Sequence, residues 1–163
     1  MSAKDALSDQ FGKQKQQGMI SLDLPHGVVP TVPGDLEDKH ITIAFLGDDV
    51  DDTAYERATK EAQRVASSTR GPLTGTVGGV DTFPPNAEGK KPAFAVPNVA
   101  GVQDLHNQLS HLDAGNFSEY HPHVTIKMLD AGEPLPAPVK TRRVSFSHIA
   151  VHRGDQVERF PFR

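Results

Sequence analysis

The chain has 163 residues, of which 36% are hydrophobic, and a formal net charge of −4. This is enough apolar material for a packed core, so global disorder is excluded, and the acidic balance disfavours binding of long duplex nucleic acid by bulk electrostatics. The absence of cysteine excludes a disulfide framework, a thiolate nucleophile and a cysteine-ligated zinc.

The N-terminal part of the chain predicts an arm, a strand and a loop. Residues 1–17 are polar and are expected to form a flexible arm before a single domain over 18–163. Residues 19–24 predict a strand that ends at Pro25, and Gly and Pro residues predict a loop over 26–38. No apolar run reaches the ~20 residues of a membrane span. We therefore expect a cytoplasmic, monomeric protein with no membrane partner.

The next segment predicts a strand followed by a helix. Residues 40–46 alternate in polarity, with His40, Thr42 and Ala44 on one face. Thr53 and Glu56 have the spacing of a capping box. Apolar positions then recur every three or four residues, which predicts one face of a helix: Ala54, Ala58, Ala62 and Val65.

The second half repeats this pattern in a different order. Strands are expected over 74–83 and 93–96, then a helix that stops near Gly115 and carries Val102, Leu105, Leu109 and Leu112 on one face. A strand over 123–129 should bury Val124, Ile126 and Met128, and a final strand pair is expected near 144–151 and 157–162. The fold class is α+β: two pseudo-symmetric lobes of antiparallel sheet, each with one main helix, around a central active-site cleft.

Two matching tetrads carry the chemical information. They are His40-Ile41-Thr42-Ile43 and His123-Val124-Thr125-Ile126. In a strand, His and Thr two residues apart share one face, while the apolar residues point into a core. If the two strands are neighbours, two imidazoles and two hydroxyls converge.

This set of groups fits cleavage of a phosphodiester. One neutral imidazole can remove a proton from water or a ribose hydroxyl, and one protonated imidazole can give a proton to the leaving oxygen. The Thr hydroxyls can donate to the non-bridging oxygens, where charge builds up. No metal or other cofactor is needed. We choose His123 as the base and His40 as the acid, but the roles can be reversed, and ligation would run the same transfers backwards.

The twin tetrads, 83 residues apart, resemble the H-x-T-x signature of the 2H phosphoesterase superfamily, which includes LigT-type 2′-5′ RNA ligases and cyclic phosphodiesterases. The resemblance implies a bilobal fold, His40 and His123 as the acid–base pair, and Thr42 and Thr125 as phosphate binders. It implies substrates such as 2′,3′-cyclic phosphates, 2′-5′ oligonucleotides or cyclic oligonucleotides. Phage members that degrade immune-signalling cyclic nucleotides belong to the same superfamily.

Other residues have a functional and a structural interpretation. Phe83 can stack on a base or close a strand end. Tyr120 can reach the cleft or lie on the surface. Lys127 shares the face of Thr125 and can attract phosphate or stay solvated. Four arginines can supply charge to the cleft: Arg142, Arg143, Arg153 and Arg159.

The remaining histidines are expected to have less direct roles. His148 and His152 should lie on the Phe146 face of a strand as structural residues. His106 and His111 should be solvated residues on the second helix.

Three functions compete. The leading one is a metal-independent phosphodiesterase acting on a nucleotide or a short or cyclic oligonucleotide. The second is a protein that sequesters a cyclic nucleotide without turnover, from the same pocket. The third is a metal-dependent hydrolase with His40, His121 and His123 as ligands.

Overall fold

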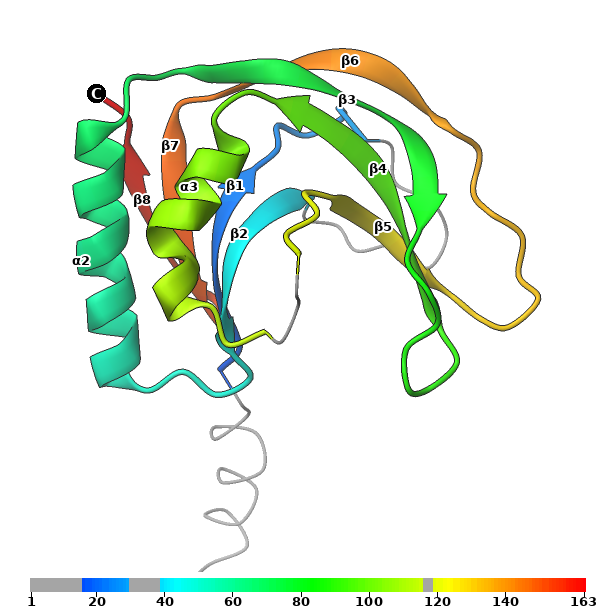
Figure 1. Cartoon of the computed structure of the whole chain (residues 1–163), viewed down its shortest axis with the longest axis horizontal. Coiled ribbons are helices and arrows are strands. Elements are labelled where there is room, and N and C mark those ends of the chain that lie inside the picture. Colours follow the sequence, from blue (N-terminus) through cyan, green and yellow to red (C-terminus); the bar gives the residue numbers. More distant parts are fainter. Residues whose placement is uncertain (1–15, 30–38, 116–118) are drawn as a thin grey trace, which may run out of the picture.

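The computed structural model describes residues 16–29, 39–115 and 119–163 (Figure 1). The predicted arm over 1–17 therefore lies outside the described residues except for Gln16 and Gln17. Most of the predicted loop over 26–38 also lies outside them.

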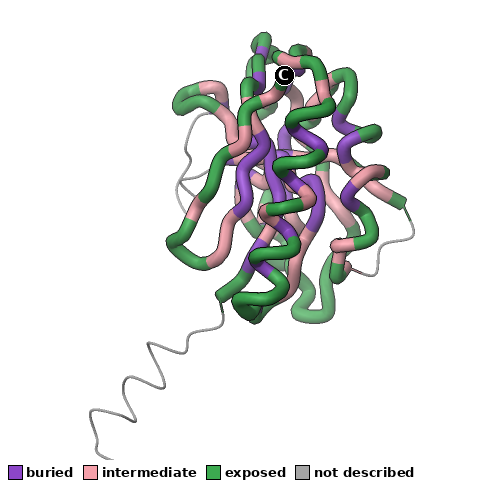
Figure 2. The backbone as a smooth tube through the Cα atoms, turned by 90° about the vertical axis from the view of Figure 1, so that its left-hand side faces the viewer, coloured by how far each residue is buried: buried purple, intermediate pink, exposed green. Residues whose placement is uncertain are grey.

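The first sheet consists of four antiparallel strands, in the order β2-β1-β7-β8. Its strands are β1 (Gly18–Asp23), β2 (His40–Gly47), β7 (His148–Arg153) and β8 (Gln156–Pro161). Helix α2 (Asp52–Ser68) packs against β7 and β8. Its buried side is built largely from alanines, which let the helix lie close to the sheet: Ala58, Ala62 and Ala66, with Tyr55 and Val65. Figure 2 shows the outward side of this helix exposed and the strands behind it buried.

The start of α2 differs from the prediction. The N-cap is Asp51, whose side chain accepts a hydrogen bond from the Ala54 backbone N–H at 2.8 Å. The capping box assigned to Thr53 and Glu56 is therefore wrong. A carboxylate two residues earlier satisfies the same free N–H groups of the first turn. Ala54 itself is exposed, so the buried face begins at Tyr55.

The second sheet also has four antiparallel strands, in the order β5-β4-β3-β6. Its strands are β3 (Leu73–Thr82), β4 (Lys91–Val99), β5 (Val124–Leu129) and β6 (Val139–Phe146). Helix α3 (Val102–Leu109) and the 3₁₀ turn η1 (Ser110–Leu112) connect β4 to β5. The apolar side of α3, formed by Val102, Leu105 and Leu109, is buried in the core. The predicted bilobal α+β fold with one main helix per lobe is confirmed.

The C-terminal strands correct the prediction. The run over 144–151 is not one strand, because it breaks at Ser147: β6 belongs to the second sheet and β7 to the first. The chain thus returns to the first lobe for its last two strands. His148 and His152 consequently lie on β7, in a different sheet from Phe146.

Strand β5 also departs from strict alternation. Met128 is 40% exposed, whereas Leu129 is buried at 2%. The pairs Ala93↔Lys127 and Phe94↔Thr125 leave Ile126 as one extra residue on β5. Such a bulge shifts the alternation of the following residues, so the predicted burial of Met128 is wrong.

Candidate active site

Both tetrads have the burial pattern that their sequences predict. In β2, Ile41 and Ile43 are fully buried, while His40 and Thr42 are partly exposed. In the second tetrad, Val124 and Ile126 are buried, and His123 and Thr125 are partly exposed. Each apolar pair anchors its strand in the core, so each imidazole and hydroxyl face outwards from it together.

The two tetrad strands meet where the two sheets adjoin. β2 and β5 are edge strands of their sheets, and their Cα atoms approach within 8 Å. Figure 1 shows both strands starting from the same part of the molecule. The tetrads stand at the N-terminal ends of β2 and β5, so the fold brings the two tetrads close to each other.

Hydrogen bonds fix this arrangement. The Tyr120 hydroxyl donates to the carbonyl of Thr42 at 2.6 Å, and the Ala114 N–H donates to that of Phe45 at 2.7 Å. His106 Nδ1 lies 2.7 Å from the Ile43 carbonyl, and its ring stacks on Tyr120 with centroids 3.9 Å apart. The prediction of a solvated His106 is therefore wrong. The segment that leads into His123 is attached to the strand that carries His40.

The environment of His123 defines its reactive nitrogen. His123 Nδ1 lies 2.8 Å from the carbonyl of His121, and a carbonyl only accepts, so Nδ1 carries the proton. Nε2 is then the nitrogen that can exchange a proton. Burial lowers the pKa of His123, helped by the charge of His121 and opposed by this hydrogen bond. The neutral imidazole is therefore favoured near neutral pH.

Two phenylalanines hold the His123 ring in place. Phe83 meets it edge-on, with centroids 4.8 Å apart, and Phe94 lies at 5.6 Å. Phe83 and Phe94 stack on each other at 4.4 Å. Phe83 thus lies beside the second tetrad, and Phe94 covers one face of the Phe83 ring.

A carboxylate stands opposite His40. Asp23 is the cross-strand partner of His40, and Ser21 is that of Thr42, so these four side chains share one face of the first sheet, here called the cleft face. The Asp23 carboxylate accepts hydrogen bonds from His152 Nε2 at 3.0 and 3.1 Å and from Ser21 at 2.7 Å. Burial raises the pKa of Asp23, but these hydrogen bonds and the charges of His152 and His40 outweigh it, so its pKa lies below the usual value. Asp23 was missed from the sequence.

The other predicted residues are spread around the site. Lys127 pairs with Ala93 and Thr125 with the next residue, Phe94, so the bulge at Ile126 puts Lys127 and Thr125 on opposite faces and the predicted shared face is wrong; Lys127 forms an ion pair with Glu133. Tyr120 is not a surface aromatic: its hydroxyl is engaged, and burial, with the charge of Asp113, raises its pKa. Arg153 lies over the Tyr55 ring, away from the tetrads, whereas Arg159 lines a pocket on the first sheet.

The described residues hold neither a metal-binding cluster nor a membrane-spanning helix. In 16–29, 39–115 and 119–163, no group of three or more His, Cys, Asp or Glu side chains is placed to hold a metal ion. No helix in the described part of the chain is long and apolar enough to cross a membrane.

Comparison with known proteins gives one family and one fold. The family model described as "2′-5′ RNA ligase superfamily" matches residues 36–157. No curated protein matches the chain by sequence. Three solved structures illustrate the shared fold. TT0787 of Thermus thermophilus has a TM-score of 0.70 and 18% identity, covering 90% of this chain and 98% of that one. E. coli LigT complexed with NADP+ has a TM-score of 0.60 and 17% identity, covering 91% and 95%. Kluyveromyces marxianus Usb1 has a TM-score of 0.59 and 9% identity, covering 92% and 100%.

Proposed function

The chain belongs to the 2′-5′ RNA ligase superfamily, which places it among phosphoesterases, and we propose that it is a metal-independent phosphodiesterase acting on RNA-type phosphodiesters. One observation carries the proposal. Two His–apolar–Thr tetrads stand at the starts of the edge strands by which the two sheets adjoin, and Tyr120, in the segment that leads into His123, donates a hydrogen bond to the Thr42 carbonyl.

The environments of the two imidazoles support different roles. His123 is the base, because burial favours its neutral form and Nδ1 is occupied, which leaves Nε2 to accept a proton. His40 is the acid, because the Asp23 carboxylate on the neighbouring strand attracts its positive charge. These roles agree with the choice made from the sequence.

The reaction proceeds by in-line displacement. His123 Nε2 takes a proton from water, whose oxygen bonds to phosphorus while the bond to the ribose oxygen breaks. His40 gives its proton to that leaving oxygen. From a 2′,3′-cyclic phosphate the product is a phosphomonoester. The hydroxyls of Thr42 and Thr125 donate to the non-bridging oxygens, where negative charge grows.

The substrate class is proposed from chemistry and from relatives. Solved structures of E. coli LigT are described as complexes with ATP, 3′-AMP and NADP+, so this fold accommodates nucleotides in that protein. For this chain we propose three substrate classes: 2′,3′-cyclic phosphates, 2′-5′ oligonucleotides and cyclic oligonucleotide signals. Cleavage of the last class would give the chain the anti-immune role of phage relatives.

The test is turnover of these three substrate types in EDTA. Cleavage should be lost in His40→Ala and in His123→Ala. His111→Ala is the matched control, because His111 lies on η1, 42% exposed, and pairs with Glu61. Tight binding without turnover would replace the proposal by sequestration. Activity that EDTA abolishes and a divalent cation restores would replace it by metal-dependent hydrolysis.

A further inference from the structure

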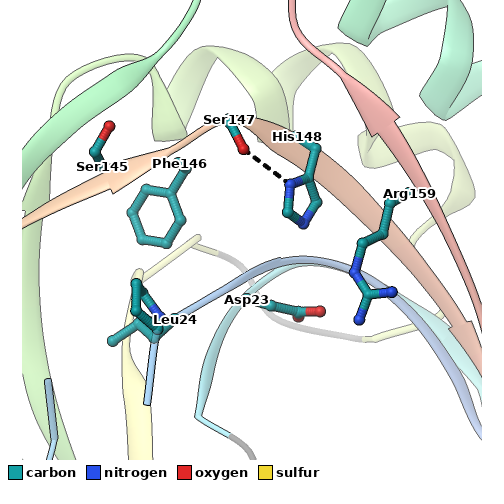
Figure 3. Close-up of a pocket in the computed structure, with 8 residues that line it drawn as sticks. Asp23, Leu24, Ser145, Phe146, Ser147, His148 and Arg159 are labelled. Carbon is teal, nitrogen blue, oxygen red and sulfur yellow. Dashed lines mark hydrogen bonds between the residues drawn. The ribbon is translucent and has the colours of Figure 1, made fainter. Parts of the chain in front are cut away.

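A cavity of about 260 Å³ lies beside the candidate site (Figure 3). Its wall includes Asp23, the cross-strand partner of His40, so it begins one strand away from the first tetrad. It continues across the cleft face of the first sheet to Arg159 on β8. Neither the tetrads nor the proposed reaction uses this space.

Strand register connects Arg159 directly to Thr42. The pairs Thr42↔Ser21, Ser21↔Ala150 and Ala150↔Arg159 form one row across the four strands, so all four residues share the cleft face. Three strand spacings separate the ends of the row, about 14 Å between Cα atoms. An extended arginine side chain and one nucleotide unit together span that distance.

The cavity has an apolar end and a polar end. Figure 3 shows Leu24 and Phe146 on one side and His148, Arg159 and Asp23 on the other. The Ser147 hydroxyl lies 3.1 Å from His148 Nδ1, which fixes the imidazole at the cavity. An apolar surface next to a cation is what the base and phosphate of a nucleotide require.

The guanidinium of Arg159 is available to a ligand. Within the described part of the chain, the Arg159 side chain forms no hydrogen bond or ion pair, and only its backbone takes part in the pairing of β7 and β8. The nearby carboxylate of Asp23 is already bound by His152 and Ser21. An incoming phosphate would therefore meet an unpaired guanidinium, while the nearby Asp23 carboxylate already has hydrogen-bond partners of its own.

We propose that this cavity binds the nucleotide on the 5′ side of the reacting one, with Arg159 holding its phosphate. The inference rests on the proposed function, and it narrows the substrate class to oligonucleotides of two or more units. With His40 as the acid, the leaving ribose oxygen lies on the His40 side. The chain 5′ of that ribose then continues towards the cavity. A volume below the roughly 300–1,000 Å³ of sites for drug-sized ligands fits one nucleotide unit.

The test compares two substrates with the same reacting group. Adenosine 2′,3′-cyclic phosphate has one phosphate, and the dinucleotide ApA ending in a 2′,3′-cyclic phosphate adds one 5′ nucleotide. Arg159→Ala should lower kcat/KM about 10- to 100-fold for the dinucleotide and leave it within twofold for the mononucleotide. Arg159→Lys should recover part of the loss. Arg64→Ala, which replaces an arginine on helix α2 that is 57% exposed and paired with Glu61, should change neither.

Each other result rejects the subsite. An equal loss on both substrates would mean that Arg159 acts on the reacting phosphate or on folding, which a thermal melt of Arg159→Ala would distinguish. No loss on either would leave Arg159 without a ligand role. If the unmodified protein turns over neither substrate, the proposed function fails. Calorimetric Kd values then test the subsite alone, measured for the mononucleotide and the dinucleotide with the unmodified protein and with Arg159→Ala. If the substitution changes the Kd of both ligands by the same factor, the subsite is rejected.

Discussion

Replacing Tyr120 by Phe removes the oxygen atom that connects the segment before His123 to the first tetrad. The hydroxyl donates to the Thr42 carbonyl at 2.6 Å, whereas the ring stacks on His106 with planes 4° apart. Phe keeps the stacking and loses only the hydrogen bond. Tyr55→Phe is the matched control, because the Tyr55 hydroxyl is buried without a hydrogen-bond partner among the described residues.

The expected loss of stability follows from leaving the part-buried Thr42 carbonyl without its partner. Removing one partner of a buried hydrogen bond costs about 1–3 kcal/mol. For a domain of this size each kcal/mol corresponds to roughly 2–4 °C in Tm. A loss of about 2 kcal/mol in Tyr120→Phe should therefore lower Tm by about 4–8 °C. Tyr55→Phe should leave Tm unchanged or raise it slightly, since it removes an unsatisfied group.

Thermal and urea denaturation measure both variants, and cleavage assays add a second readout. If the bond positions Thr42, Tyr120→Phe should also lower kcat at temperatures where the protein is fully folded. Equal Tm changes in the two variants would refute the reasoning, because both would then report only the loss of a polar atom. A Tm loss with unchanged kcat would reduce Tyr120 to a structural residue.

Three further predictions concern the reaction. The acidic limb of the kcat/KM profile should have its inflection below about 6.5, because burial lowers the pKa of the base His123 and keeps it neutral to lower pH; an inflection above that value contradicts the assignment. Asp23→Asn should move the alkaline limb to lower pH and leave the acidic limb in place, because it removes the charge that attracts the proton on His40; an unchanged alkaline limb would separate Asp23 from the acid. Thr42→Val and Thr125→Val should each lower kcat about 10- to 1,000-fold, with Thr→Ser retaining most of the activity, and similar losses in Val and Ser variants would indicate packing instead.

The parts of the site that the sequence predicts are those with local periodicity. A strand buries every second residue, so His40 and Thr42 must share a face once Ile41 and Ile43 enter the core. Asp23 obeys the same rule on β1, and the alternation of Ser21 and Asp23 with Ile20 and Leu22 was the signal that could have found it. What no local signal gives is the register that sets Asp23 opposite His40.

Contacts between distant segments and strand ends without turn residues escape sequence analysis. The Tyr120 hydroxyl bonds a backbone carbonyl 78 residues away, and a carbonyl has no sequence signature. Ser147 separates two strands of different sheets although neither glycine nor proline marks the break. The residues around it therefore look like one continuous strand, and the return of the chain to the first lobe stays hidden.

That return has a consequence for the site. The first tetrad stands on β2, but its surroundings come from β1, β7 and β8, and the last two strands arrive from the other lobe. His152, which binds Asp23, and Arg159, which lines the cavity, both come from these strands. β7 follows β6 through the single residue Ser147, which lines the cavity beside Asp23. The two sheets are thus connected near the first tetrad at two places, through the Tyr120–Thr42 hydrogen bond between β2 and the segment before β5, and through Ser147 between β6 and β7.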